Sequence, residues 1–190
     1  MIILASQSPR RKEILKDILG DGIPFQCVPS HFDERTVHDS DVKIYCLKEA
    51  MGKGEEVSRL YPDDITIASD TMVSYQGKLL GKPKDHDDAL RMLRLLSGNT
   101  HEIVTAYVIR KGDIELKHRI CVSHLFIEKM ADAEIKAYLD TGSPYDKAGG
   151  YGVQDSEFIN AKVIDGEYYT IMGLPRDALE KDLVNLGIIE

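Results

Sequence analysis

The sequence has few basic residues, few cysteines and no long hydrophobic run, and each shortage excludes a class of protein. Lysine and arginine number 24 against 32 aspartate and glutamate, which gives a formal net charge of −8. General nucleic-acid binding depends on basic side chains that neutralise phosphates, so this balance argues against a nucleic acid polymer as partner. No apolar run approaches the roughly 18–20 residues of a membrane helix, so no membrane partner is expected either.

The N-terminus and the cysteines predict a cytoplasmic protein. Residues 1–5 are apolar and are followed by Pro9 and three basic residues, whereas a secretory signal places its basic region first. The three cysteines are odd in number, far apart and without a CxxC pair: Cys27, Cys46 and Cys121. Free thiols in a reducing compartment are therefore expected. His118 and His124 share a strand face, but no acidic or thiol ligands repeat nearby, so zinc is not expected.

Helix-like and strand-like segments alternate along the chain. Strands are expected at residues 2–5, 25–28, 65–75, 100–111, 114–129 and 157–164. Helices are expected over 9–19 and 42–59, from Asp85 until Gly98 stops the helix, and after residues 132 and 175. The pattern predicts an α/β fold with a mixed, partly antiparallel sheet flanked by helices. With no repeat, linker or low-complexity tract, one domain over residues 1–190 is expected.

Several residues set the expected helix ends. Ser8 before Pro9 is typical of a helix start, and Gly20 ends that helix. Asp132 is expected to cap a short helix, and Pro175 to sit in the first turn of the terminal helix. In the terminal helix the side chains expected to face inward are Ala178, Leu179, Leu183 and Leu186.

The turn at residues 6–12, Ser-Gln-Ser-Pro-Arg-Arg-Lys, is a candidate anion site. Free N–H groups at a helix start attract anions, and arginine adds bidentate contacts to phosphate. The alternative is that the three basic residues only solvate a helix face. Because positive charge in a first helical turn opposes the helix dipole, we favour the anion site.

Three further segments carry candidate functional groups. Asp70 lies in an apolar strand, where a carboxylate is desolvated, paired or bound to a cation. Residues 77–82 resemble a phosphate-binding P-loop only faintly, because the glycine spacing is short and Pro83 replaces the serine or threonine. Residues 146–154 are glycine-rich and end in Gln154, whose amide can read the edge of a base.

Together these segments favour an enzyme that handles phosphates. The basic side chains that could surround a polyanion are Arg10, Arg11, Lys53, Lys82 and Lys147. Glu34 and Asp70 are available for a divalent cation, which would lower the charge of the ligand. Lys53 could instead be a solvated helix lysine, and Asp33 rather than Glu34 could be the second carboxylate.

The order of motifs resembles the Maf family, nucleotide pyrophosphatases once described as septum-formation inhibitors. The matching motifs are LASQSPRR (4–11), ASDT (68–71), GKP (81–83), LSGNTH (96–101), DKAG with YGVQ (146–154) and MGLP (172–175). The resemblance implies a fold like that of the inosine triphosphate pyrophosphatases, with two lobes around a cleft. It also implies Mg²⁺- or Mn²⁺-dependent hydrolysis of a nucleoside triphosphate to the monophosphate and pyrophosphate, and a homodimer.

The resemblance implies roles for individual residues. Asp70 would be the proton acceptor, and Glu34 with Asp70 would lie at the metal. The residues implied to hold the triphosphate are Ser8, Arg11, Lys53 and Lys82. Lys147 is a further candidate loop contact, on the residue pattern alone. Those implied in base selectivity are Arg10, Thr71 and Gln154. The pattern looks like the dTTP/UTP branch of the family; the alternatives are a 7-methyl-GTP pyrophosphatase or a nucleotide-binding regulator of cell division without turnover.

Two residues depart from the family pattern. Asp155 follows Gln154 where the family usually has glycine, and Ala106 stands where glycine is common. Asp155 adds a negative charge beside the residue implied to read the base.

Overall fold

The computed structural model describes residues 1–190, which divide into two compact units. Unit 1 comprises Met1–Thr71, Val104–Val122 and Glu167–Glu190, and unit 2 comprises Met72–Ile103 and Ser123–Gly166. Both chain termini therefore belong to unit 1. Three long strands contribute residues to both units.

The strands form one mixed sheet with the order β2-β1-β3-β5-β6-β7, and β4 pairs with β3. Their bounds are β1 (Ile2–Leu4), β2 (Phe25–Cys27), β3 (Ile65–Tyr75), β4 (Lys78–Leu80), β5 (Thr100–Lys111), β6 (Ile114–Ile127) and β7 (Ala161–Asp165). β1 runs parallel to β2 and β3, whereas β4 is antiparallel to β3 and β7 is antiparallel to β6. The predicted mixed, partly antiparallel sheet flanked by helices is confirmed.

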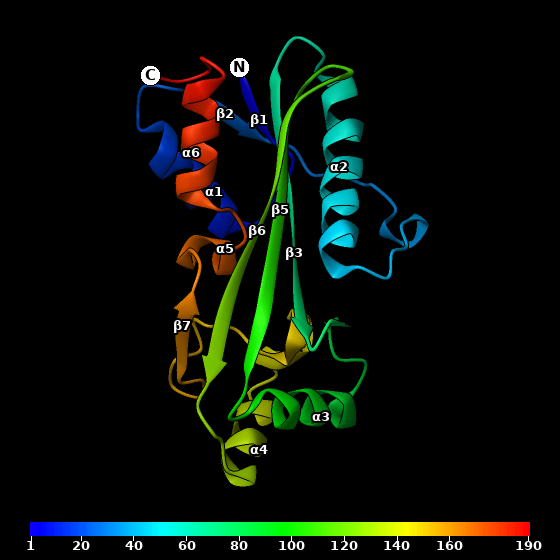
Figure 1. Cartoon of the computed structure of the whole chain (residues 1–190), viewed down its shortest axis with the longest axis vertical. Coiled ribbons are helices and arrows are strands. Elements are labelled where there is room, and N and C mark those ends of the chain that lie inside the picture. The colour runs from blue at the N-terminus through cyan, green and yellow to red at the C-terminus, as the bar shows by residue number, and fades with distance from the viewer. The chain divides into compact units, whose positions relative to one another are not determined.

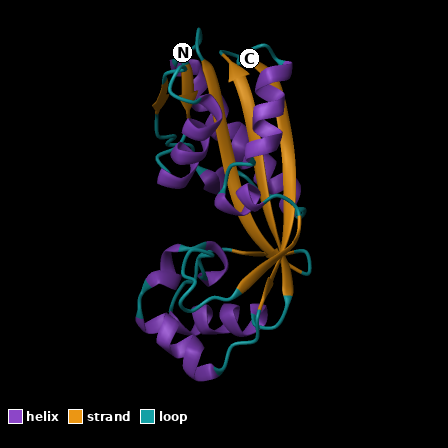
Figure 2. Cartoon of the chain, turned by 90° about the vertical axis from the view of Figure 1, so that its left-hand side faces the viewer, coloured by secondary structure: helices purple, strands orange, loops and turns teal.

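Unit 1 buries both faces of its strands. Its helices are α1 (Pro9–Leu19), η1 (Glu34–Thr36), α2 (Val42–Leu60), α5 (Tyr168–Met172) and α6 (Arg176–Asn185). Figure 1 shows α1 and α6 on one face of the strands and α2 on the other, and Figure 2 shows these elements by type. Since successive strand side chains point to opposite faces, Leu4 joins the cluster with α1 and α6, and Ile3 joins Val57 of α2.

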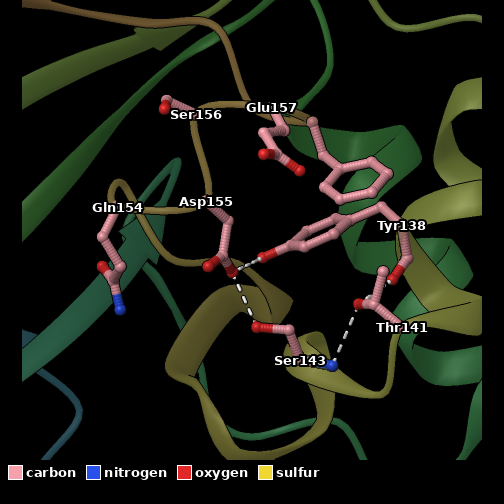
Figure 3. Close-up of a pocket in the computed structure, with 8 residues that line it drawn as sticks. Tyr138, Thr141, Ser143, Gln154, Asp155, Ser156 and Glu157 are labelled. Atoms are coloured by element: carbon pink, nitrogen blue, oxygen red, sulfur yellow. Dashed lines mark hydrogen bonds between the residues drawn. The ribbon is translucent and has the colours of Figure 1, made fainter.

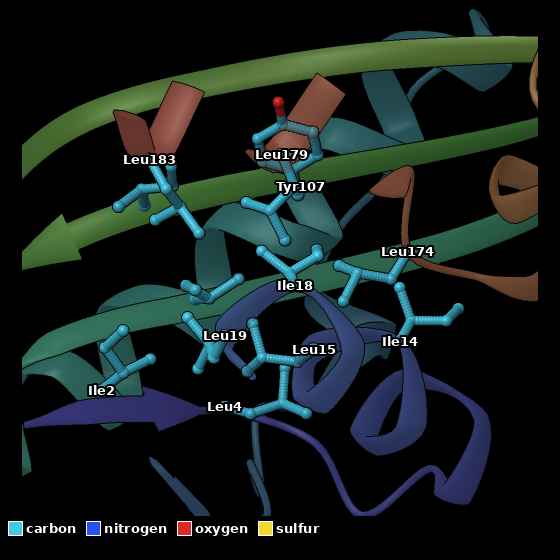
Figure 4. Close-up of a cluster of buried hydrophobic side chains, with 12 residues drawn as sticks. Ile2, Leu4, Ile14, Leu15, Ile18, Leu19, Tyr107, Leu174, Leu179 and Leu183 are labelled. Carbon is cyan, nitrogen blue, oxygen red and sulfur yellow. The ribbon is translucent and has the colours of Figure 1, made fainter. Parts of the chain in front are cut away.

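The larger core cluster of unit 1 surrounds α1 (Figure 4). Ile14, Leu15, Ile18 and Leu19 lie against strand residues and against α6. Burial of each such side chain stabilises the fold by roughly 1.5–3 kcal/mol, which fixes the position of the α1 N-terminus on the sheet. The predicted start and end of α1 are confirmed: Ser8 is the N-cap, and Gly20 N donates to Lys16 O.

Unit 2 contains α3 (His86–Leu96), α4 (Asp132–Asp140) and two short turns of 3₁₀ helix, η2 (Ser143–Asp146) and η3 (Ala148–Gly150). α3 packs against α4 and η3. Asp85 caps α3 by accepting a hydrogen bond from Asp88 N. η3 and the last residue of η2 lie within the segment 146–154 that was predicted to be glycine-rich.

Some predicted boundaries were wrong. The strand predicted over 157–164 is β7, but it begins only at Ala161. Residues 156–158 form a turn instead, because Phe158 N and Ile159 N both donate to Asp155 O. The short strand β4 was not predicted; Gln76 and Gly77 form a tight hairpin turn with positive φ angles of 50° and 74°.

Details of three helices also differ from the predictions. α4 begins at Asp132 itself, and Glu134 accepts a hydrogen bond from Ala131 N in place of the predicted Asp132 cap. Pro175 is the N-cap of α6 and lies just outside its first turn. Leu186, predicted to face inward, follows the end of α6 and is 38% exposed. None of the helices has the length and apolar character needed to cross a bilayer.

Candidate active site

The strand β3 presents three polar residues to its two faces. Ser69 Oγ donates to Gly173 O at 3.2 Å, and Thr71 Oγ1 accepts from Arg11 Nη2 at 3.2 Å, so both lie on the face of β3 that carries Gly173 and Arg11. Asp70, between them, points the other way, toward α2. The alternation of a strand therefore separates the candidate catalytic carboxylate from the threonine beside it.

Lys53 of α2 joins the two candidate metal carboxylates. Its Nζ lies 2.6 Å from Asp70 Oδ1 and 2.7 Å from Glu34 Oε1. Burial lowers the pKa of Lys53, but the negative charge of Asp70 and the hydrogen bonds to both carboxylates raise that pKa above its ordinary value overall. Lys53 is thus a charged residue held between carboxylates, and the alternative of a solvated helix lysine is wrong.

The loop before α2 places Glu34 at this position. The Phe32 ring lies over Gly52, where a Cβ atom would overlap it. Ser30 Oγ and His31 N both donate to Glu56 of the same helix, at 2.5 Å and 2.8 Å. These contacts fix the loop on α2 beside Lys53.

Asp33 has a different partner. Its two carboxylate oxygens accept from Arg35 Nε and Nη2 at 2.8 Å and 2.9 Å. The hydrogen bonds from Arg35 lower the pKa of Asp33. Glu34, and not the alternative Asp33, is therefore the carboxylate at Lys53.

Arg11 is fixed on the other face of β3. Its Nε donates to Gly173 O at 2.8 Å, and Thr71 Oγ1 also contacts Thr105 Oγ1 at 2.9 Å. Gly173 has a φ of +100°, and a Cβ atom there would lie 3.2 Å from Arg11 Nε. Glycine is required both for this backbone conformation and for the close approach of the guanidinium. Burial lowers the pKa of Arg11, against the opposing effect of the Asp70 charge.

Ser8 and Arg10 flank Arg11 at the start of α1. Ser8 Oγ accepts from Arg11 N at 3.5 Å, a long cap bond. Arg10 is exposed and has no hydrogen bond or ion pair to the rest of the protein. The helix start therefore carries one arginine that is held and one that is free.

Two buried residues near this group were not predicted. Glu49 of α2 is 2% exposed and neither of its carboxylate oxygens has a partner. Burial, followed by the charges of Glu34 and Asp70, raises the pKa of Glu49 to about 7. Cys46 Sγ donates to Asp70 O at 3.2 Å, and burial raises the pKa of this thiol to about 12, so Cys46 is a structural, unreactive cysteine.

The remaining predicted site residues lie in unit 2. Lys82 and Gln154 are exposed. Lys147 Nζ donates to Ser143 O at 2.7 Å, to Ser143 Oγ at 3.0 Å and to Asp146 Oδ1 at 2.8 Å. Lys147 is thus tied within its own loop.

Hydrogen bonds at Gly149 and Tyr151 hold the glycine-rich loop of unit 2 in place. His101 Nε2 and the Tyr151 hydroxyl form a short hydrogen bond of 2.5 Å, and Gly149 N donates to Gly81 O at 3.0 Å. The second bond joins this loop to the GKP motif. Beyond Gln154 lies a pocket of about 310 Å³, drawn in Figure 3; its lining residues are Tyr138, Thr141, Ser143, Gln154, Asp155, Ser156, Glu157 and Phe158.

Comparison with solved structures defines the class of fold. The Ham1 protein of Staphylococcus aureus superposes with a TM-score of 0.51 at 15% identity, covering 97% of this chain and 98% of that one. The predicted likeness to this α/β fold is confirmed.

Sequence comparison then gives the family. The chain belongs to the Maf family, since the family described as "Maf-like protein" matches residues 1–186. A dTTP/UTP pyrophosphatase of Lacticaseibacillus casei (strain BL23) is 38% identical over 184 residues, covering 97% of this chain and 98% of the relative. A dTTP/UTP pyrophosphatase of Clostridium botulinum (strain Okra / Type B1) is 40% identical over 193 residues, covering 98% and 97%.

Proposed function

We propose that this protein is a nucleoside triphosphate pyrophosphatase that hydrolyses dTTP and UTP with the help of a divalent cation, Mg²⁺ or Mn²⁺. Water adds to the α-phosphorus, the bond from this phosphorus to the α–β bridging oxygen breaks, and the nucleoside monophosphate and pyrophosphate are released. The observation that carries the proposal is the convergence of Glu34 and Asp70 on Lys53. Maf relatives named dTTP/UTP pyrophosphatases support the choice of substrate.

Asp70 is the proposed proton acceptor. One of its oxygens accepts from Lys53 at 2.6 Å, which leaves the second oxygen to take a proton from the attacking water. Lys53 holds this carboxylate in place, and it neutralises charge on the phosphates. Arg11 and Ser8, at the start of α1, are proposed to bind phosphate oxygens.

The two carboxylates fit a cation that arrives with the substrate. No group of three or more histidine, cysteine, aspartate or glutamate side chains is arranged to hold a metal ion by itself. Mg²⁺ usually takes one or two carboxylates and completes its shell with water and substrate phosphates, so Glu34 and Asp70 suffice. When bound, the cation would neutralise the triphosphate and polarise its P–O bonds.

The base-side roles rest on the family motifs. Arg10 is exposed and without a partner, and Thr71 lies beside Arg11. Lys82 is proposed to contact phosphate, and Gln154 is proposed to read the base. The activity would lower dTTP, UTP or modified pyrimidine nucleotides in the free nucleotide pool of the cytoplasm.

The test is release of pyrophosphate and monophosphate from dTTP, UTP, CTP, GTP, ATP and 7-methyl-GTP, with Mg²⁺, with Mn²⁺ and with EDTA. Asp70→Asn is expected to lower kcat at least a hundredfold, whereas Asp63→Asn, an exposed aspartate before the same strand, is expected to match the wild type. Full activity of Asp70→Asn would disprove the catalytic assignment. Binding without turnover would instead indicate a regulator, and a preference for 7-methyl-GTP would disprove the proposed substrate.

A further inference from the structure

Glu49 of α2 is a buried carboxyl group that the proposed reaction does not use. Neither of its oxygens receives a hydrogen bond from any part of the protein. A buried carboxyl group without a partner is costly, because it has lost its hydration and has gained nothing in exchange. The fold therefore keeps Glu49 at this position against a cost, which calls for a partner that arrives in another state of the site.

Glu49 lies one helical turn before Lys53. Residues four apart on a helix are neighbours on one face, and a glutamate four residues before a lysine is the favourable order for an ion pair. Lys53 does not form this pair, because its ammonium lies 2.6 Å from Asp70 Oδ1 and 2.7 Å from Glu34 Oε1. The nearest carboxyl group along the helix is thus left unused by the lysine beside it.

The charges around Glu49 place it in the same electrostatic group. Burial is the main cause that raises the pKa of Glu49 to about 7; the charges of Glu34 and Asp70 raise it further, and the charge of Lys53 lowers it. Three carboxyl groups thus share one ammonium. Glu49, which has no bond to that ammonium, is partly protonated at neutral pH and needs no counter-charge while Lys53 stays with the other two.

The two ion pairs of Lys53 differ in exposure. The side chain of Glu34 is 61% exposed, whereas those of Asp70 and Lys53 are each 14% exposed. An exposed ion pair contributes little to stability, while breaking a buried one is strongly destabilising. Lys53 can therefore give up Glu34 at small cost while it keeps Asp70.

We propose that Glu49 is a positioning residue that takes over the Lys53 ammonium from Glu34 when Glu34 binds the divalent cation. The inference rests on the proposed function, in which Glu34 and Asp70 hold that cation. An ammonium has three N–H donors, so Lys53 keeps its bond to Asp70 while a second donor turns from Glu34 to Glu49. The Lys53 charge then stays paired and no longer competes with the cation for Glu34.

The experiment titrates Mn²⁺ without nucleotide into the full-length proteins at pH 7, by isothermal titration calorimetry. Glu49→Gln is expected to bind Mn²⁺ about tenfold more weakly than the wild type, because a Lys53 displaced from Glu34 then finds no second anionic partner. With UTP, the Mn²⁺ concentration for half-maximal rate should rise by the same factor, while kcat at saturating Mn²⁺ stays close to the wild-type value because Lys53 remains on Asp70. The matched control is Glu55→Gln, which removes an exposed ion pair with Arg59 on the same helix and should bind Mn²⁺ like the wild type.

The same substitution is then made in a Lys53→Met background. If Glu49 acts by receiving Lys53, Glu49→Gln no longer changes the Mn²⁺ affinity there. An affinity that Glu49→Gln leaves intact in the wild-type background, or weakens equally without Lys53, would overturn this inference alone. A wild type that hydrolyses UTP equally well in EDTA, or a Mn²⁺ affinity unaffected by Glu34→Gln, would overturn the proposed cation site as well. Thermal unfolding of each variant confirms that the compared proteins are folded.

Discussion

The ammonium of Lys53 lies 2.6 Å from Asp70 Oδ1, and the same nitrogen is 2.7 Å from Glu34 Oε1. One positive charge thus already joins the two carboxylates proposed to bind a divalent cation. A cation entering without nucleotide would meet the Lys53 charge at short range, whereas the negative triphosphate would compensate both positive charges. The pairing therefore favours a cation that binds together with the substrate.

Lys53→Met is expected to bind Mn²⁺ more tightly without nucleotide while losing turnover. Removing one positive charge about 4 Å from a divalent cation removes roughly 2 kcal/mol of repulsion even at the dielectric of bulk water, or about thirtyfold in affinity. Isothermal titration with Mn²⁺ measures the affinity. The control is Lys48→Met, on the same helix as Lys53, which removes an exposed ion pair with Asp39 and should bind Mn²⁺ like the wild type. Equal affinities in all three proteins would refute this account of Lys53.

Arg10 and Arg11 are neighbours that should differ in their effect on stability. Arg11→Ala removes hydrogen bonds to Gly173 O and Thr71 Oγ1 and leaves these groups partly buried, so the free energy of unfolding should fall by about 1–3 kcal/mol. Arg10→Ala changes an exposed side chain without a partner and should stay within about 0.5 kcal/mol of the wild type. Urea denaturation measures both. Equal losses in the two variants would contradict the contacts seen for Arg11.

Those residues of the site that belong to a recognisable sequence motif could be predicted from the sequence. Asp70, Thr71 and Arg11 stand in such motifs, and the capped start of α1 follows from Ser8 and Pro9. Their division between the two faces of β3 follows from strand alternation. What the sequence left open was the choice between Asp33 and Glu34, because that choice depends on the side chain of Arg35.

Other features were hidden because their cause lies in tertiary packing. Glu49 is indistinguishable from a solvated helix glutamate until the helix is placed on the sheet. Lys147 stands in a glycine-rich loop, as a phosphate-binding lysine would. In the fold, however, its ammonium donates hydrogen bonds to Ser143 and Asp146. The strand predicted from residue 157 failed because Asp155 begins a turn there. Local pattern gives the element types, while burial and partners come only from the fold.

Glu49 should make the protein less stable as the pH rises. Its pKa in the folded state is about 7, against an ordinary value of 4.5, so between these values the folded state holds a proton that the unfolded state has lost. The free energy of unfolding therefore falls from about pH 4.5 to pH 7, by on the order of 3 kcal/mol. Glu49→Gln removes this fall and should be more stable than the wild type at pH 8. Glu56→Gln on the same helix, whose carboxylate accepts from Ser30, should instead be destabilising. A wild type and a Glu49→Gln variant with parallel pH profiles would contradict the raised pKa.

His101 should act in the opposite direction over nearly the same pH range. Burial, assisted by the charge of His124, lowers the pKa of His101 to about 4 from an ordinary 6.5. Between these values the unfolded state binds a proton that the folded state does not, so the free energy of unfolding falls as the pH drops from 6.5 to 4. The effects of Glu49 and His101 on the pH dependence of the free energy of unfolding therefore partly cancel in the wild type. Each effect is measured as the difference between a variant and the wild type.

His101→Gln is expected to remove the acid-side loss of stability, which is on the order of 3 kcal/mol between pH 6.5 and pH 4. Tyr151→Phe removes the hydrogen bond to His101 Nε2 but keeps the histidine buried, so it should lower stability at every pH and preserve the slope. His118→Gln, an exposed histidine paired with Glu115, is the control and should leave the His101 slope in place. Urea unfolding at half-unit pH steps measures all four proteins. Burial accounts for the slope and the hydrogen bond for the offset, so a slope lost in Tyr151→Phe would show that the hydroxyl, and not desolvation, keeps His101 neutral.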